Sequence, residues 1–394
     1  MPDYSIYLHI PFCIHRCAYC DFNTYAGLEQ LIPAYVEALC REINQSAESA
    51  AERFPVHTIF FGGGTPSLLP AGQVERILST LERVFDFKPG IEVTLEANPG
   101  TVSQPYWRDL RPLGVNRLSL GMQSANNEQL RLLERQHGLL DVLQAVDWAR
   151  KAGFANLNLD LIFGIPYQTL EMWRQTLERA LALRPDHLSL YALTLEHGTP
   201  MQNWVNRGLL PQPDDDLAAD MYETASQRLA EAGFGQYEIS NWARQDESGN
   251  LFSCRHNLQY WRNLPYLGFG AGAHGYAVGM RTANVLSPSA YIKRCQAGSP
   301  QEFPRTAATV EANPISLQSE IGETMMMGLR LTREGVSASI FEQRFGVPIT
   351  DLFQNRIERL ENAGLLEWAG ENHDILRLTS RGRLLGNQVF MEFI

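Results

Sequence analysis

Apolar residues in roughly the first 230 positions follow two alternating periodicities. Short runs rich in β-branched and aromatic residues recur, and the segments between them repeat apolar positions every three or four residues, as helices do. After the first run, for example, Val36, Leu39, Cys40 and Ile43 fall on one helical face. The predicted strands are SIYLHIP (5–11), HTIFFGG (57–63), IEVTLEA (91–97), RLSLGMQ (117–123), LNLDLIFG (157–164) and HLSLYALT (187–194).

This alternation of strands and helices predicts βα units joined into a parallel sheet. Six strands are fewer than the eight of a closed (β/α)8 barrel, so the sequence favours a partial, open (β/α)6 barrel of the α/β class. A doubly wound sheet is the alternative. In both folds ligands bind at the carboxyl ends of the strands, where several conspicuous motifs of this sequence follow the predicted strands.

The pattern changes twice after the barrel. We expect a barrel domain over 1–232, an extension rich in aromatic residues and glycine over 233–313, and a C-terminal domain over 314–394. The last region predicts three helices (317–331, 337–346 and 349–365), a hairpin (365–379) and a final helix near Ser380, which is typical of a winged helix. Because acids are mixed among the bases of DLFQNRIERLENAG, we expect a packing or partner domain with no nucleic acid bound.

Charge and composition exclude several classes of protein. The chain has 394 residues, of which 44% are hydrophobic and 20% charged, as in globular proteins. Its net charge of −11 argues against a broad nucleic-acid or anionic-membrane surface. No apolar run approaches the ~18 residues of a membrane span, and no basic region precedes the first apolar residues as in a signal peptide. We therefore expect a cytoplasmic protein, in which six cysteines are not a disulfide framework.

Three cysteines, Cys13, Cys17 and Cys20, follow the first predicted strand at C-x3-C-x2-C spacing. Thiolates are soft ligands that suit zinc or iron–sulfur clusters. Three of them can hold three irons of a [4Fe-4S] cube, whose usual complement is four cysteines. The fourth iron then stays open, as catalytic metals keep one position open.

The spacing leaves alternatives for the fourth position. A zinc site would use the three cysteines with His9 or His15. Cys254 and Cys295 are distant in the sequence and remain candidates as a fourth cluster ligand. Cys40 lies on the apolar face of the first predicted helix, so we interpret it as a small core residue.

An aromatic residue, Tyr19, directly before the third cysteine, and the motif GGGTP (62–66) after the second predicted strand complete a wider pattern. Together with the cysteines, they make the chain similar to the radical S-adenosylmethionine (SAM) superfamily. The resemblance implies that the open iron binds the amino and carboxylate groups of SAM, and that an electron from the cluster cleaves its C–S bond. Glycines in the motif would let backbone groups approach the cofactor.

Further motifs narrow the resemblance: YLHIPFC, GGGTPSLL, EANPG, LSLGMQS, ERQH and NLDLIFGIP. Together they resemble the oxygen-independent coproporphyrinogen oxidase group. The resemblance implies a SAM pocket lined by Tyr7, Tyr19, Gly63, Gly64, Thr65, Glu96, Gln123, Arg135 and Asp160. Taken singly, Asp160 also suits a turn cap and Arg135 a surface helix.

Two departures separate the sequence from the decarboxylating oxidase. Phe22 stands where that enzyme has a further cysteine, and only twelve residues precede Cys13 where the oxidase has a longer segment. Both differences fit a sister family of haem chaperones. HNLQYW (256–261) and YLGFGAGAHGY (266–276) resemble that family's haem-associated region.

The resemblance makes His256 the candidate haem ligand, because histidine is the usual axial ligand of haem iron. Tyr260, Trp261 and Tyr266 would pack on the macrocycle, and Cys254 is a competing ligand. Within this region GAGAHG matches G-x-G-x-x-G. However, no acidic residue occurs between Gly275 and Glu302, and no helix is predicted after the motif, so we do not expect a dinucleotide site.

The resulting expectation is a haem chaperone that carries a [4Fe-4S] cluster with SAM on its open iron. It would deliver haem to a membrane-bound haem protein such as a respiratory enzyme, and an electron donor would serve the cluster. The location would be cytoplasmic, extending to the inner face of a membrane. The alternative is an oxygen-independent coproporphyrinogen III oxidase, or another radical SAM enzyme that acts on a tetrapyrrole.

Overall fold

The computed structural model describes residues 3–246, 249 and 251–394, and these divide into two compact units. The first unit joins Pro265–Asn313 to the chain up to Arg228, and the second combines Leu229–Leu264 with Pro314–Ile394. The expected middle segment, 233–313, is therefore shared between the units. The reason is strand pairing, since the chain after Pro265 adds strands to the edge of the barrel sheet.

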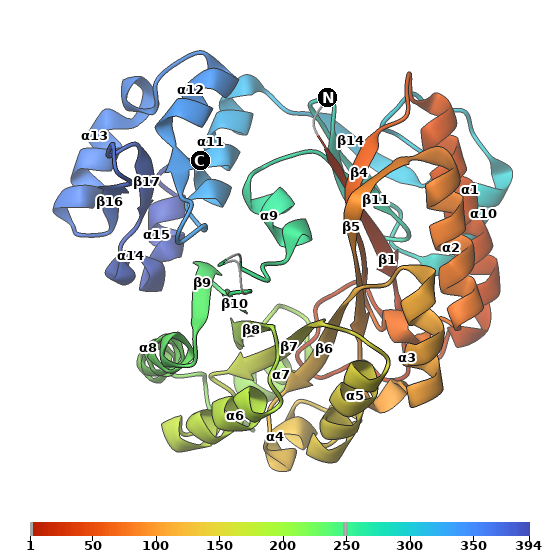
Figure 1. Ribbon diagram of the computed structural model, residues 1–394, viewed down its shortest axis with the longest axis horizontal. Coiled ribbons are helices and arrows are strands. Elements are labelled where there is room, and N and C mark those ends of the chain that lie inside the picture. The colour runs from red at the N-terminus through yellow and green to blue at the C-terminus, as the bar shows by residue number, and fades with distance from the viewer. Residues whose placement is uncertain (1–2, 247–248, 250) are drawn as a thin grey trace. The chain divides into compact units, whose positions relative to one another are not determined.

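All six predicted strands are present in the first unit and run parallel (Figure 1). They cross the sheet in chain order, without the reversal of strand order that a doubly wound sheet requires. Beyond β1, the edge is extended by one further parallel strand and then by antiparallel strands. The strands are, in sheet order, β14 (Thr309–Pro314), β13 (Met280–Asn284), β12 (His274–Ala277), β11 (Tyr266–Phe269), β1 (Tyr4–Ile10), β4 (Pro55–Gly63), β5 (Asp86–Ala97), β6 (Arg117–Gln123), β7 (Asn156–Phe163) and β8 (His187–Ala192).

Helices line the outer face of this sheet, and α1, α2 and α10 lie side by side there (Figure 1). The apolar stripe predicted for the first helix is buried as expected, with Val36, Leu39 and Ile43 fully inaccessible. The helices of the unit are α1 (Ile32–Ser49), α2 (Ala71–Val84), α3 (Gln104–Leu110), α4 (Asn127–Leu132), α5 (Leu139–Lys151), α6 (Leu170–Ala182), α7 (Pro200–Asn206), α8 (Asp215–Glu231) and α10 (Pro288–Ala297). Two short strands, β2 (Phe12–Cys13) and β3 (Tyr25–Ala26), pair within the cysteine loop.

The face of the sheet turned away from the helices carries polar side chains at alternate strand positions. Thr58 on β4 donates to Ser5 on β1 at 2.6 Å, and Asn158 on β7 donates to Ser119 on β6 at 2.8 Å. His187 on β8 lies 2.7 Å from the side-chain oxygen of Asn158. Because buried polar groups need partners, these bonds hold the interior of the barrel in one arrangement below the strand ends.

The second unit contains the expected C-terminal helices and hairpin. Its small sheet has the order β15-β17-β16, and its core includes Met325, Phe341 and Leu376. This arrangement is winged-helix-like, as predicted. The elements are β9 (Phe234–Glu238), β10 (Asn241–Arg244), α9 (Arg255–Trp261), α11 (Leu317–Gly328), β15 (Val336–Ser337), α12 (Ala338–Phe345), α13 (Ile349–Asn362), β16 (Leu366–Ala369), β17 (Ile375–Leu378), α14 (Ser380–Leu384) and α15 (Gly386–Phe390).

Candidate iron–sulfur and SAM site

The three cysteines lie in the loop between β1 and α1, at the carboxyl end of the first strand. Cys13 is buried, whereas Cys17 and Cys20 are partly exposed. A turn closes the loop, in which the backbone N–H of Cys20 donates to the carbonyl of Cys17 at 3.1 Å. The intervening Ala18 is bonded through its backbone to Leu133 and Met201, so the loop is anchored to the neighbouring strand-end segments.

Each cysteine sulfur has a polar neighbour from the protein. The hydroxyl of Thr65 donates to Cys13 Sγ at 3.5 Å, and Arg135 Nη1 donates to Cys17 Sγ at 3.5 Å. The hydroxyl of Thr24 lies 3.8 Å from Cys20 Sγ. Burial raises the pKa of both Cys13 and Cys20 and so disfavours their thiolates. The polar neighbours, together with a bound metal centre, would act in the opposite direction and favour the thiolate.

The two histidines of the zinc alternative are engaged elsewhere. His9 Nδ1 lies 3.0 Å from the hydroxyl of Tyr7, and its Nε2 lies 2.9 Å from the carbonyl oxygen of Asn23. His15 Nε2 lies 3.2 Å from a carboxylate oxygen of Glu134. Among the described residues, no three histidine, cysteine or acidic side chains are gathered as a single metal ion would need.

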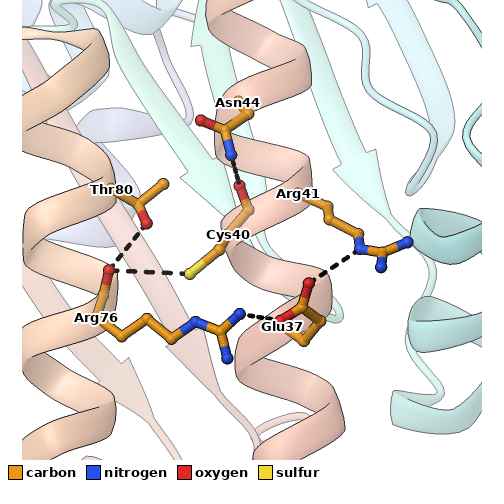
Figure 2. Close-up of polar contacts among 6 residues, drawn as sticks. All are labelled: Glu37, Cys40, Arg41, Asn44, Arg76 and Thr80. Atoms are coloured by element: carbon orange, nitrogen blue, oxygen red, sulfur yellow. Dashed lines mark hydrogen bonds and ion pairs between the residues drawn. The ribbon is translucent and has the colours of Figure 1, made fainter.

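The other described cysteines are buried in their own surroundings. Cys40 points from α1 toward α2, where its Sγ lies 4.0 Å from the carbonyl oxygen of Arg76, which also accepts a bond from Thr80 (Figure 2). Its interpretation as a core residue agrees with this burial. Cys295 is buried on α10, and Cys254 precedes α9 in the second unit.

The glycines of GGGTP pack closely under the first strand. A Cβ atom on Gly63, whose φ is +108°, would lie 2.5 Å from the His9 ring, and one on Gly64 would lie 2.7 Å from the carbonyl oxygen of Phe12. Backbone bonds from Gly64 to Ile10 and from Thr65 to Phe12, both 2.8 Å, hold the motif there. The glycines thus let the end of β4 lie close to the end of β1 and the residues after it. This is a second reason for glycine here, beside the expected approach of a ligand.

Two predicted carboxylates face the interior from strands β5 and β7, which lie on either side of β6. Glu96 Oε2 accepts a bond from the backbone N–H of Gly63 at 3.2 Å, and burial followed by repulsion from Asp160 raises the pKa of Glu96 to about 8. Asp160 accepts bonds from Ser119 at 3.0 Å and Asn158 at 2.8 Å, while its burial raises its pKa. Such carboxylates can accept hydrogen bonds from hydroxyl and ammonium donors of a ligand.

Gly121 supports the side chains of Gln123 and Arg135. The guanidinium Nη2 of Arg135 donates to the carbonyl oxygen of Gly121 at 3.1 Å. A Cβ atom on Gly121 would lie 2.9 Å from Gln123 Nε2 and 3.0 Å from Arg135 Nη2. Gln123 itself has a φ of +63°, which is uncommon outside glycine and marks a constrained position at the end of β6.

Direct interactions bring the predicted residues of the first unit into a common neighbourhood. Arg135 reaches both Cys17 and Tyr19, and Thr65 joins the glycine motif to Cys13. On the other side, Glu96 accepts a hydrogen bond from Gly63 of the glycine motif and, when ionised, repels negative charge on Tyr7 and Asp160. The expected cluster and SAM residues therefore lie together at the strand ends.

His256 has different surroundings in the second unit. Its side chain is buried, its Nε2 lies 2.9 Å from the hydroxyl of Tyr260, and the two rings meet edge to face. Trp261 lies under the guanidinium of Arg330, 4.4 Å from the ring centroid. The role of His256 as haem ligand stays a prediction.

The donor set fits an iron–sulfur cluster and an anionic cofactor group. Three thiols share one loop, and each sulfur has a hydroxyl or guanidinium beside it, as cluster sulfurs often do. Arg135 Nε is buried without a hydrogen-bond partner among the described residues, which leaves one donor for a ligand.

Known proteins match this chain over nearly its full length. A model described as the radical SAM superfamily matches residues 7–180, and one described as the HemN C-terminal domain matches residues 315–385. The chain is 39% identical to the heme chaperone HemW of Lactococcus lactis over 99% of this chain and 97% of that protein. It is 37% identical to the heme chaperone HemW of Bacillus subtilis over 99% of both. The chain belongs to the HemW family of radical SAM proteins.

The fold of this HemW-family chain is that of a solved relative. Coproporphyrinogen III oxidase (HemN) from Escherichia coli, described as a radical SAM enzyme, superposes with a TM-score of 0.82 over 99% of this chain and 90% of that one. At 24% identity, this likeness concerns the fold. Within the described part of the chain, the search for a helix both long and apolar enough to cross a bilayer finds none.

Sequence reasoning missed three residues that support the candidate site. Gly121 had a signal, because an isolated glycine inside a strand pattern often marks a close approach. Asn23, whose carbonyl fixes His9, had no local signal. Glu42 is a fully buried acid on α1, and only its position beside the apolar stripe set it apart.

Proposed function

We propose that the chain is a haem chaperone that binds haem and passes it to an acceptor protein. The observation that carries the proposal is the near full-length similarity to relatives named heme chaperones, in a chain that has the cysteine trio. The cytoplasm is the proposed location, and the acceptor is a membrane-bound haem protein such as a respiratory enzyme. With a net charge of −11, the chain would meet it through a specific contact rather than through anionic lipid.

Cys13, Cys17 and Cys20 would hold a [4Fe-4S] cluster, and the strand-end residues would hold SAM. When bound, this pair supplies one-electron chemistry at the sulfonium of SAM. Arg135 is placed to neutralise a cofactor carboxylate, because its guanidinium is held beside Cys17 and has a donor to spare. Glu96 and Asp160 would accept bonds from hydroxyl or ammonium groups, and Tyr7 would border them.

Haem titration into the purified full-length protein tests the proposal. We expect a saturable Soret band, followed by its transfer to an apo-acceptor when the two proteins are mixed. Absence of saturable haem binding by the cluster-loaded and the cluster-free protein would overturn the chaperone function.

The fold likeness to HemN makes coproporphyrinogen oxidation the rival activity. Cluster-loaded protein should be incubated anaerobically with SAM, a reductant and coproporphyrinogen III. We expect no protoporphyrinogen IX, partly because Phe22 replaces the oxidase's additional cysteine. Its formation at a catalytic rate would decide for the oxidase. An electron donor for the cluster is proposed in either case.

A further inference from the structure

A haem ligand must present an accessible nitrogen, and the nine histidines of the chain differ sharply in this respect. Most are buried or hydrogen-bonded within the protein. The buried ones are His9, His137, His187 and His256. His57 lies 3.1 Å from the hydroxyl of Ser5. The exposed ones are His15, His197, His274 and His373.

Two of the four exposed histidines have a protein partner at the ring. His15 is paired with Glu134 at 3.2 Å, and His373 Nδ1 lies 3.4 Å from the carbonyl oxygen of Trp368. For His197 and His274, no hydrogen bond to the ring is present within the described residues. His197 lies in the loop before α7, whereas His274 opens strand β12. A ligand on a strand is held more firmly than one on a loop.

The register of the sheet fixes His274 at the edge of the barrel. Its backbone pairs with Ala283 on β13, and Gly268 on β11 packs so closely that a Cβ atom there would overlap the His274 carbonyl oxygen. Strand β11 in turn pairs with β1, with Gly268 opposite Tyr7. A single strand, β11, thus separates the strand of His274 from the strand of Tyr7, a predicted SAM-pocket residue.

The turn before His274 is bonded to buried groups. The backbone N–H of Gly270 donates to Glu42 at 2.9 Å, and that of Ala271 donates to the phenol oxygen of Tyr35 at 2.7 Å. Asn284 donates to the carbonyl oxygen of Gly270 at 3.0 Å. These bonds define the direction in which the chain enters β12, so the imidazole is presented by a rigid support.

The same turn contacts the cysteine loop. Asn23, three residues after Cys20, donates to the carbonyl of Ala271 at 3.0 Å and to that of Leu286 at 3.0 Å. The neighbouring Phe22 and Leu286 expose 63% and 59% of their surface, so apolar side chains flank this junction. His274 follows Ala271 by three residues, so its exposed imidazole belongs to the same turn as this junction. An imidazole and exposed apolar side chains are the two things that a haem needs, an iron ligand and an apolar contact for the macrocycle.

We propose that His274 is the axial ligand of haem iron, at the edge of the barrel beside the cysteine loop. The inference rests on the proposed haem-binding function and names the residue that performs it. The neutral imidazole donates a nitrogen lone pair to iron, and no covalent bond of the porphyrin changes. Phe22 and Leu286 would contact the porphyrin.

The decisive experiment compares haem titrations of the full-length wild type, His274→Ala and His256→Gln. For His274→Ala we expect at least a tenfold weaker affinity and a shifted Soret maximum, with restoration of the wild-type spectrum by added imidazole. For His256→Gln we expect a wild-type Soret position and resonance Raman spectrum. His197→Ala and His373→Ala are matched controls at exposed histidines and should bind as the wild type does.

Each contrary result has a defined meaning. Wild-type protein without haem binding refutes the proposed function itself. Haem binding by the wild type with an unchanged His274→Ala affinity and spectrum refutes only the assignment of His274, as does loss of the native spectrum in His256→Gln or His197→Ala alone. A circular dichroism melt identifies any histidine variant that has misfolded. In that case the haem affinity of the double variant Phe22→Ser/Leu286→Ser tests the proposed location of the haem. That affinity should fall at least threefold, and wild-type affinity would contradict the proposed location.

Discussion

The carboxylate of Glu42 accepts a hydrogen bond from the backbone N–H of Gly270 at 2.9 Å, although 228 positions separate the two residues. Asn284, Tyr291 and Thr306 donate to the same carboxylate at 2.6–2.8 Å. Burial raises the pKa of Glu42, and these four donors oppose that shift. A single acid on α1 therefore anchors the chain segment that completes the edge of the barrel.

Replacing Glu42 with Ala should destabilise the first unit strongly, because buried donors would lose their acceptor. We expect a loss of about 3 kcal/mol in the free energy of unfolding, and a smaller loss for Glu42→Gln. Urea denaturation followed by tryptophan fluorescence measures it. Glu37→Ala is the control on the same helix, since Glu37 forms ion pairs with Arg41 and Arg76 at the surface (Figure 2) and should cost at most about 1 kcal/mol.

Substituting any one of Cys13, Cys17 and Cys20 by Ser should remove the cluster, because each thiolate would be one of only three protein ligands. Iron and sulfide content and the visible absorption of reconstituted protein measure the loss. Cys40→Ser is the matched control and should retain full iron content, since its sulfur points toward α2 (Figure 2). A variant of the trio that still held four irons would contradict the ligand assignment.

Gly121→Ala should weaken SAM binding while leaving the cluster in place. The added methyl group would displace Gln123 and Arg135, which lie 2.9 and 3.0 Å from its position. We expect at least a tenfold rise in the dissociation constant of SAM, about 1.4 kcal/mol, measured by calorimetry on cluster-loaded protein. Gly72→Ala is the control, because a Cβ atom there meets nothing within 4 Å. Unchanged SAM affinity in Gly121→Ala would show that this glycine does not support the SAM pocket.

The raised pKa of Glu96 predicts a specific pH dependence of stability. Its pKa is about 8 in the folded protein against about 4.3 in an unfolded chain, so folding favours the protonated carboxyl. The contribution is fully present below the unfolded pKa and is lost as the pH rises toward and through 8. From about pH 6 to about pH 8.5, a range that includes the folded pKa, the Tm of the wild type should fall relative to that of Glu96→Gln.

The difference between the two proteins isolates this carboxyl, because their other titrating groups are shared. Glu75→Gln, at an exposed position on α2, should follow the wild type across the same pH range. Parallel Tm curves for the wild type and Glu96→Gln would show that Glu96 is ionised in the folded protein at neutral pH.

Local patterns in the sequence were sufficient for the strands and for the cysteine loop. Alternating runs such as RLSLGMQ became β6 over the residues expected, because a period of two in apolar residues fits a strand and not a helix. The predicted strands also carry Glu96 and Asp160, which the parallel sheet brings near each other. These features depend on residues that are close in the sequence or on a regular sheet, and both produce a periodic pattern of residue types in the sequence.

Long-range partners left no such trace. Arg135 reaches a sulfur 118 positions away, and Asn23 bonds to carbonyl groups 248 and 263 positions away. Tertiary packing decides these contacts, and residue spacing does not encode it.

The pairing of Asn23 with Ala271 and Leu286 also orders events during synthesis. The cysteine loop leaves the ribosome early, but the carbonyl groups that fix it are translated only after most of the barrel. Until then the loop lacks its final anchors. Metal loading of the nascent chain would therefore meet an incompletely formed loop.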